Sequence, residues 1–177
     1  MQPDPFQILG LSPRFDLDES AIRRAYLARV SAIHPDLAGA ETAQPNGQDA
    51  SAELNHAREI LTNPETRATA LLAVLGGPTK EADKSLPPGF LMDIMETREA
   101  IEASLAGDQS ERARWLAWGI AQRQAFTAQV RAQFAAAAHS PDSLRQIRTT
   151  LNAWRYIERL IEQLDPAYDP GKADFRA

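Results

Sequence analysis

The chain has 177 residues, of which 44% are hydrophobic and 24% charged, a balance typical of a soluble globular protein with one or two small domains. It contains no cysteine, which excludes disulfides and cysteine-ligated zinc or iron–sulfur sites within the chain and favours a reducing cytoplasm. The formal net charge of −5 disfavours a nucleic-acid partner. The sequence shows neither a long apolar run nor a signal-like leader, so we expect no membrane partner.

Apolar residues recur at helical spacing along nearly the whole chain, without the sustained alternation of a strand, so we predict an all-α fold. The predicted helices cover, in chain order, residues 5–9, 18–33, 49–62, 64–75, 90–106, 110–138 and 141–164. Prolines and glycines at both ends of residues 77–89 predict a linker between an N-terminal four-helix unit (1–76) and a C-terminal three-helix bundle (90–165). Residues 166–177, which include two prolines, are expected to form a loose tail.

The triplet His34-Pro35-Asp36 follows the second predicted helix. Proline cannot continue a helix, so His34 is expected to end the helix and Asp36 to begin a loop. An ordinary helix terminus is one interpretation, and an enzyme that uses His34 as a base is another. However, the sequence has no serine elbow, glycine-rich phosphate loop or HExxH pair, and its three histidines are far apart. We therefore predict that the chain is not an enzyme and holds neither a metal nor a cofactor; turnover by the purified chain alone would contradict this.

Four segments in a fixed order resemble the J-domain, by which co-chaperones dock on DnaK-type ATPases. They are PFQILGL at residues 5–11, Ala25-Tyr26, the triplet, and LNHAREIL at residues 54–61. The resemblance implies a helical hairpin with short flanking helices that stimulates ATP hydrolysis by the chaperone. In this interpretation Pro35 fixes a turn that presents the Asp36 carboxylate to a basic partner residue. The chaperone-binding residues that the resemblance implies are His34, Pro35, Asp36, Arg23, Arg24 and Arg29.

The second helix departs from the J-domain pattern in its charge. Helix positions that are often basic in the family hold Leu27, Ala28 and Ala32, and Leu37 stands where a lysine commonly follows the triplet. Charges at the rim of an interface mainly set the association rate and its salt dependence, so we expect a weaker electrostatic contribution or a specialised chaperone. An alternative role for Arg29 is a surface ion pair with a neighbouring carboxylate such as Glu59.

The helix predicted over residues 90–106 carries more apolar surface than one core stripe needs. One side is expected to face the bundle and holds Phe90, Ile94, Ile101 and Leu105. A different side holds Leu91, Met92 and Met95 among Glu96, Glu99 and Glu102. Exposed methionine and leucine flanked by carboxylates predict an adaptable binding surface. Burial under the N-terminal unit or the linker is the alternative.

The last predicted helix begins with a strong start signal, because Ser140 precedes Pro141 and Asp142 falls in the first turn. Its apolar residues form one stripe at steps of three and four: Leu144, Ile147, Leu151, Trp154, Ile157, Ile161 and Leu164. We expect this helix to pack antiparallel to the helix before it and to form the core of the bundle.

The resemblance extends beyond the J-domain to HscB-type co-chaperones of iron–sulfur cluster biogenesis. FLMDIMETRE at residues 90–99 is similar to the start of their C-terminal domain, and NPETRA at residues 63–68 also matches. This domain binds IscU, the scaffold on which clusters are assembled. The implied scaffold-binding residues are Leu91, Met92, Met95, Glu96, Glu99 and Tyr156. Tyr156 stands where the family often has phenylalanine, and packing between the domains is its alternative role. Ala103 stands where a further acidic contact is expected, so that contact is absent or moved to Glu102.

Together these resemblances imply a cytoplasmic adaptor that brings an IscU-like scaffold to an HscA/DnaK-type chaperone and stimulates the chaperone ATPase. It would thereby assist iron–sulfur cluster assembly and protein maturation. The expected partners are these two proteins, with no nucleic acid, membrane, metal or cofactor. The alternative is a J-domain co-chaperone whose C-terminal bundle binds a different client.

Overall fold

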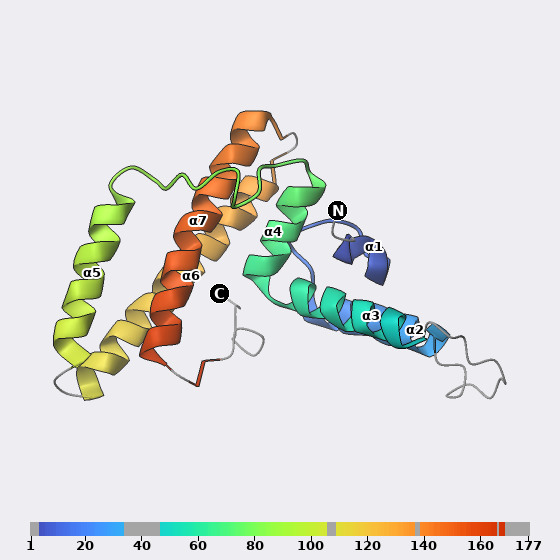
Figure 1. Cartoon of the computed structure of the whole chain (residues 1–177), viewed down its shortest axis with the longest axis horizontal. Helices are drawn as coiled ribbons and strands as arrows, with labels where there is room; N and C mark the ends of the chain where they lie inside the picture. Colours follow the sequence, from blue (N-terminus) through green and yellow to red (C-terminus); the bar gives the residue numbers. More distant parts are fainter. Residues whose placement is uncertain (1–3, 34–46, 106–108, 137–138, 166, 169–177) are drawn as a thin grey trace. The chain divides into compact units, whose positions relative to one another are not determined.

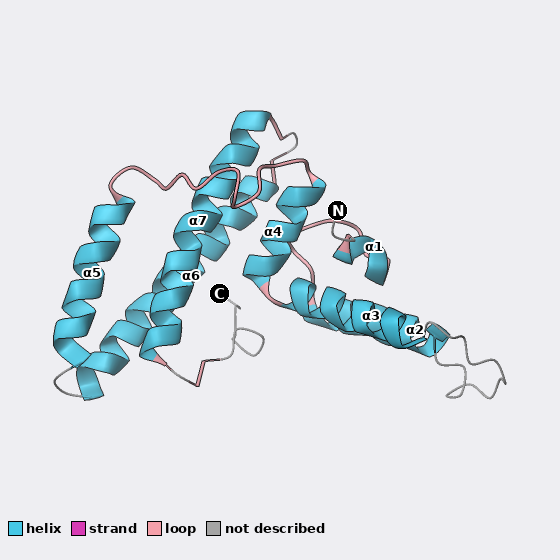
Figure 2. Ribbon diagram, viewed as in Figure 1, coloured by secondary structure: helices cyan, strands magenta, loops and turns pink. Residues whose placement is uncertain are grey.

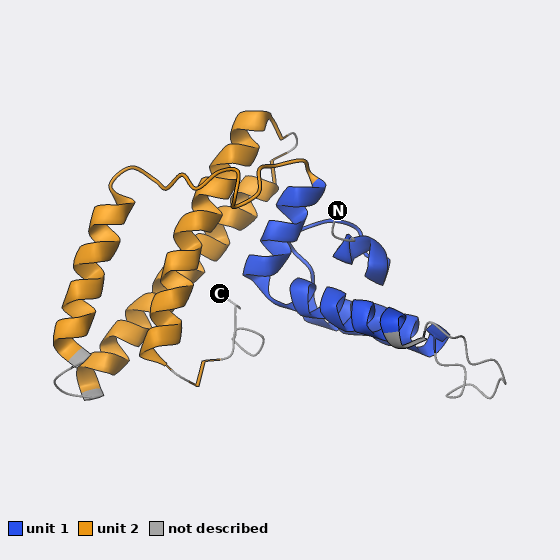
Figure 3. Cartoon of the chain, viewed as in Figure 1, with its two compact units in different colours: residues 1–74 blue, residues 75–177 orange. Residues whose placement is uncertain are grey.

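The structure is a computed structural model that describes residues 4–33, 47–105, 109–136, 139–165 and 167–168. The chain forms two compact units, Met1–Val74 and Leu75–Ala177 (Figure 3). The described residues form seven α-helices and no strand (Figures 1 and 2), which confirms the predicted all-α fold. In chain order the helices are α1 (Pro5–Leu9), α2 (Glu19–Ile33), α3 (Gly47–Thr62), α4 (Pro64–Val74), α5 (Phe90–Leu105), α6 (Gln109–Phe134) and α7 (Pro141–Leu164).

The first unit is a hairpin of α2 and α3, which lie side by side, with α1 and α4 packed against α3 (Figure 1). Local signals define the short α1: the Asp4 side chain accepts a hydrogen bond from the Phe6 N–H at 2.9 Å, and Gly10 ends the helix at φ 69°. The fully buried side chains of Phe6, Ile22 and Leu61 form the centre of this unit's core.

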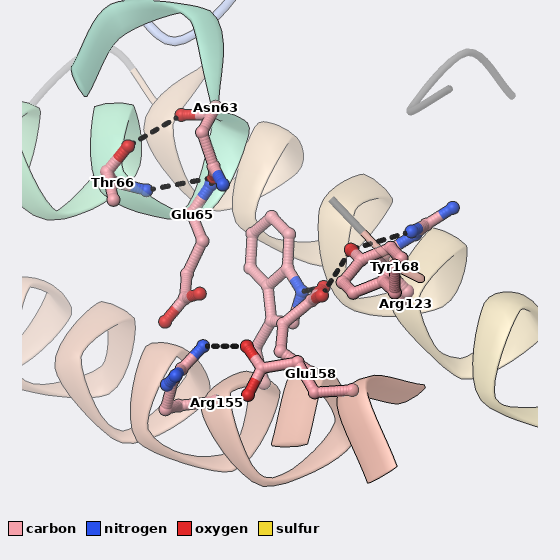
Figure 4. A network of polar contacts seen from close by, with 9 residues as sticks. Asn63, Glu65, Thr66, Arg123, Arg155, Glu158 and Tyr168 are labelled. Atoms are coloured by element: carbon pink, nitrogen blue, oxygen red, sulfur yellow. Dashed lines mark hydrogen bonds and ion pairs between the residues drawn. The ribbon is translucent and has the colours of Figure 1, made fainter. Parts of the chain in front are cut away.

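The start of α4 is fixed by Asn63, whose Oδ1 accepts hydrogen bonds from the N–H groups of Glu65 at 2.8 Å and Thr66 at 3.3 Å (Figure 4). One turn later, the buried Arg67 donates from Nη1 to the Leu17 carbonyl at 3.1 Å. Its guanidinium also lies 5.5 Å from the centre of the Phe15 ring. Arg67 therefore ties the segment between α1 and α2 to α4, which a sequence pattern alone does not reveal.

The second unit is built on the long α6 and α7, which run in opposite directions, with α5 packed against them (Figure 1). Ser140 caps α7 as predicted, because its side chain accepts from the Ser143 N–H at 3.1 Å. The predicted stripe on α7 is buried throughout, and Trp154 at 0% exposure is the largest buried side chain. Gly119 permits a close approach of α6, since a Cβ there would lie 2.9 Å from Ile161 Cγ1.

Helix α6 ends at Phe134, earlier than the predicted end at residue 138. The residues after Phe134 are a run of alanines. Alanine is a good helix former, but it offers little side-chain area to bury, so helix propensity alone did not extend α6.

A buried polar network holds Tyr168 against α6 and α7 (Figure 4). The Glu158 carboxylate, only 2% exposed, accepts hydrogen bonds from Trp154 Nε1 and from the Tyr168 hydroxyl, both at 2.7 Å. Arg123 Nη1 in turn donates to the Tyr168 hydroxyl at 3.0 Å. Burial, reinforced by the hydrogen bond to Glu158, raises the pKa of Tyr168 above its ordinary value. At Tyr168 the structure therefore departs from the expected loose tail, because the hydroxyl is needed to satisfy a buried carboxylate.

The segment expected to be a linker, residues 77–89, belongs to the second unit. Asn152 on α7 donates from Nδ2 to the carbonyl oxygens of Asp83 and Ser85, both at 3.0 Å. The buried Arg148 orients Asn152 by donating from Nε to Asn152 Oδ1 at 2.9 Å. These hydrogen bonds fix the segment on α7, so the boundary between the units falls after Val74.

Candidate docking surfaces

The start of α5 is set by the backbone before it. Gly89 adopts the left-handed conformation at φ 80°, which side-chain-bearing residues rarely adopt. Its carbonyl accepts hydrogen bonds from the N–H groups of Met92 at 3.0 Å and Asp93 at 3.2 Å. The Phe90 N–H donates to the Pro87 carbonyl at 3.1 Å. The fixed residues 77–89 and this turn together determine where the first turn of α5 lies in the second unit.

Helix α5 has one buried and one exposed apolar face. Ile94 at 7% exposure and Ile101 at 0% face the bundle core. On the other face Leu91 is 50%, Met92 69% and Met95 56% exposed, which confirms the exposure predicted for these side chains. We call Leu91, Met92 and Met95 the methionine patch. The alternative of burial under the linker is not found, because the three side chains stay exposed although residues 77–89 belong to the same unit.

Two glutamates border the methionine patch without an ion pair. Glu96 and Glu99 are exposed, and neither lies in a salt bridge with another described residue. Glu102 differs, because Arg98 Nε lies 3.0 Å from its Oε1 in a pair one helical turn apart. We call Glu96 and Glu99 the acidic edge, since both can form an ion pair with a partner, while Glu102 already has a basic neighbour.

Tyr156 on α7 packs against the first turn of α5. Its ring centre lies 5.9 Å from that of Phe90 in an edge-to-face arrangement. Phe90 makes a second edge-to-face contact with Phe126 on α6, at 6.2 Å. Tyr156 is half-buried in these contacts within the second unit. The sequence reasoning missed the role of Phe126 and Phe90 in joining all three helices at this end of α5, because contacts between distant aromatics have no local signal.

The triplet His34-Pro35-Asp36 lies outside the described residues. The three arginines assigned to the same surface lie on α2 and are exposed. Arg24 Nη1 donates to Ser20 Oγ at 2.8 Å. The Arg29 guanidinium lies against Gly10, where a Cβ would stand 2.5 Å from Arg29 Nη2. Arg29 and Glu59, both among the described residues, do not form the ion pair that was named as an example of the alternative. Arg23 shares a helix face with Leu27, which is 50% exposed.

The hairpin that carries α2 is held by contacts between sequence segments that the J-domain resemblance rests on. The Tyr26 hydroxyl donates to Asn55 Oδ1 at 2.7 Å. The Arg58 guanidinium lies 4.5 Å from the centre of the Tyr26 ring. The side chain of Tyr26 thus links α2 to α3, which explains why these residue types occur at these positions.

Two other classes of site find no support in the described residues. None of the helices there combines the length and apolar character that a bilayer-spanning helix requires. In the same parts of the chain, acidic and histidine side chains do not gather in groups of three that suit a metal ion.

Two family models match the chain. A DnaJ domain model matches residues 4–69, and a model described as the HSCB C-terminal oligomerisation domain matches residues 86–165. The two matches follow the division into units, since one runs from α1 into the first part of α4 and the other spans α5 to α7. They bear out the resemblance derived from the sequence motifs.

The chain is also similar to curated proteins named as co-chaperones. A Co-chaperone protein HscB homolog from Azoarcus sp. (strain BH72) is 26% identical over 172 residues, which are 96% of this chain and 96% of the relative. The corresponding protein of Pasteurella multocida is 28% identical over 92% of this chain and 94% of its own length. The mitochondrial J-type co-chaperone jac1 of Schizosaccharomyces pombe is 40% identical, over 51% of this chain and 40% of the relative.

Solved structures share the fold. The human co-chaperone protein HscB superposes with a TM-score of 0.75 at 21% identity, covering 92% of this chain and 81% of the human chain. Chaperone HscB from Vibrio cholerae gives a TM-score of 0.72 at 23% identity and covers 92% of this chain and 95% of its own. The arrangement of a J-domain followed by a three-helix bundle is therefore common to all three chains.

Proposed function

Because the chain belongs to the HscB-type family of J-domain co-chaperones, we propose that it delivers an IscU-like iron–sulfur scaffold to an HscA/DnaK-type chaperone. In this proposal it stimulates the ATPase of the chaperone and thereby assists iron–sulfur cluster assembly. The chain makes no covalent change itself; it brings two proteins together.

The observation that carries the proposal is the methionine patch. Three large apolar side chains stand on the outer face of a helix whose opposite face already fills the core, so folding alone does not require them. A few apolar anchors surrounded by polar residues are typical of the centre of a binding surface. Methionine adapts to irregular surfaces because its side chain is unbranched and polarisable. The patch suits the apolar part of a scaffold protein.

The carboxylates beside the methionine patch indicate the charge that the client's docking surface should have. Glu96 and Glu99 are exposed and make no ion pair with described residues, so their charges are available to a basic surface. Charges at a rim steer association and select partners more than they add affinity. We therefore expect the scaffold to present basic residues around an apolar spot. Tyr156 supports this surface by packing on Phe90, directly before the patch.

On the chaperone side, the proposal assigns docking to the triplet together with Arg23 and Arg24 on α2. These arginines are exposed, and the matched DnaJ domain spans both them and the triplet. Leu27 stands between them and the end of the helix, where the family often has a basic residue. The chaperone that docks here is therefore expected to depend less on charge attraction than chaperones of fully basic J-domains.

The proposal is tested by replacing both patch methionines. The double variant Met92→Ser, Met95→Ser removes two apolar anchors and should weaken scaffold binding by about tenfold or more, measured by calorimetry. Circular dichroism should stay unchanged, because neither side chain fills the core. Val74→Ser is the matched control, since Val74 is a 41% exposed apolar residue outside the patch and should bind as the unaltered chain does.

Two outcomes would redirect the proposal. Unchanged scaffold binding by the double methionine variant would show that the client docks elsewhere. Stimulation of the chaperone ATPase without any scaffold binding would favour the alternative, a J-domain co-chaperone that serves another client.

A further inference from the structure

The methionines of this chain are concentrated on one surface. The sequence contains three methionines and no cysteine. Met1 lies outside the described residues, and both other methionines belong to the methionine patch, where Met92 is 69% and Met95 56% exposed. In the described parts of the chain, the oxidisable sulfur therefore stands entirely on the candidate client-docking surface.

We propose that Met92 and Met95 form an oxidation site through which hydroperoxides switch off docking of the client. This inference rests on the proposed function, because it takes the methionine patch to be the docking surface. The ligand class is a two-electron oxidant such as hydrogen peroxide. The proposed modification is conversion of each thioether to methionine sulfoxide.

The reaction balances without a further co-reactant. A lone pair on Sδ attacks one peroxide oxygen, so an S–O bond forms while the O–O bond breaks. The sulfur loses two electrons and becomes a sulfoxide, and the peroxide is reduced to water after the transferred oxygen's proton passes to the departing hydroxide. One peroxide is consumed for each methionine.

The oxidant can reach the sulfur atoms of Met92 and Met95 without any opening of the helix bundle. Met92 and Met95 lie three residues apart on the outer face of α5, next to the exposed Leu91. The core beneath is filled by Ile94 and Ile101, which contain no sulfur. Because the chain has no thiol, no faster-reacting sulfur within it competes for the oxidant.

The modification would affect docking and spare the fold. A sulfoxide is polar and chiral, so oxidation leaves Leu91 as the single unmodified apolar side chain of the patch. A polar sulfoxide buried against an apolar partner surface has to lose its hydration, which opposes binding. Since both methionines stand outside the core, the helices keep their packing. Methionine sulfoxide reductases reverse the modification, so the site has the properties of a switch.

The test compares two forms of the full chain. The unaltered chain and the variant Met92→Leu, Met95→Leu are each treated with hydrogen peroxide, and the oxidant is removed before an IscU-like scaffold is added. Peptide mass spectrometry should find one added oxygen on Met92 and one on Met95. Scaffold binding by the oxidised chain should fall about tenfold or more, with unchanged circular dichroism, and should return after treatment with sulfoxide reductases. The affinity of the leucine variant before treatment sets its own baseline, and peroxide should not change that affinity.

Each contrary result has a distinct meaning. Undiminished binding by the doubly oxidised chain overturns the switch but leaves the proposed function intact. An equal loss of binding in the peroxide-treated leucine variant also overturns it, because the loss would then come from another residue. Failure of the untreated chain to bind the scaffold overturns the proposed function, and the switch with it. Slow or absent oxidation of Met92 and Met95 contradicts the oxidation site itself.

Discussion

The exposed faces of α2 and α5 are opposite in charge and differ in how their side chains are held. On α2 the arginines are partly engaged within their own unit, Arg24 by Ser20 and Arg29 against Gly10. On α5 the methionine patch and its two glutamates have no such neighbours among the described residues. The basic surface on α2 attracts an acidic partner, and the acidic surface on α5 attracts a basic one. The two partners therefore do not compete for the same surface.

The largest expected effect is the loss of chaperone docking while scaffold binding is kept. Asp36→Asn removes the carboxylate that we assign to chaperone docking and should abolish stimulation of the chaperone ATPase. Scaffold binding, measured by calorimetry, should not change, because α5 belongs to the other unit. The control is Asp49→Asn, the same change at an exposed aspartate on α3, which should leave stimulation intact. Normal stimulation by the Asp36 variant would refute the assigned role.

The next effect concerns the stability of the second unit, to which α5 belongs. Glu158→Ala removes the acceptor for Trp154 Nε1 and the Tyr168 hydroxyl, and should destabilise the second unit by about 3 kcal/mol. Urea unfolding followed by tryptophan fluorescence reports on this unit, because all three tryptophans, at positions 115, 118 and 154, belong to it.

Glu162→Ala is the control for the Glu158 variant. Glu162 pairs at 3.1 Å with Arg155, but both side chains are partly exposed, so its loss should cost less than about 1 kcal/mol. Equal costs for the two variants would mean that the buried network contributes no more than a surface ion pair.

A smaller effect, on the rate of scaffold association, should distinguish Glu96 and Glu99 from Glu102, which pairs with Arg98. Glu96→Gln with Glu99→Gln should slow scaffold association by about threefold to tenfold and reduce its salt dependence, measured by stopped-flow kinetics. Glu102→Gln should change the rate less, because Arg98 already balances that charge. A larger effect of Glu102→Gln would place the acidic contact there instead.

The smallest effect is a change in stability at high pH. The pKa of Tyr168 is raised in the folded chain, so above pH of about 10 the unfolded chain loses this proton while the folded chain keeps it. The stability that the tyrosine contributes is therefore complete below its ordinary pKa and declines as the pH rises further. Tyr168→Phe should flatten this decline in urea unfolding at pH values above about 10. An unchanged slope would mean that Tyr168 is not buried beside Glu158 in solution.

The sequence allowed most helix boundaries to be predicted, because their causes are local. Asp4 with Pro5, Asn63 with Pro64 and Ser140 with Pro141 supply a cap and a proline within one turn of each helix start. The exposed methionine patch was also predictable, since periodicity alone separates it from Ile94 and Ile101. The end of α6 was not, because alanines continue a helix by propensity without giving it a side chain to bury.

By itself the sequence determined that the chain is all-α, where its helices begin, which face of α5 stays outside, and which families it resembles. These properties follow from residues within one or two helical turns of each other in the sequence and from motifs that occur in a fixed order. Only the tertiary structure decided that Asn152 fixes residues 77–89 on α7, that Tyr168 completes the environment of Glu158, and that Phe90 meets both Phe126 and Tyr156. These contacts join residues far apart in the chain, and hydrogen-bond partners and ring contacts at such distances depend on packing geometry that no local pattern encodes.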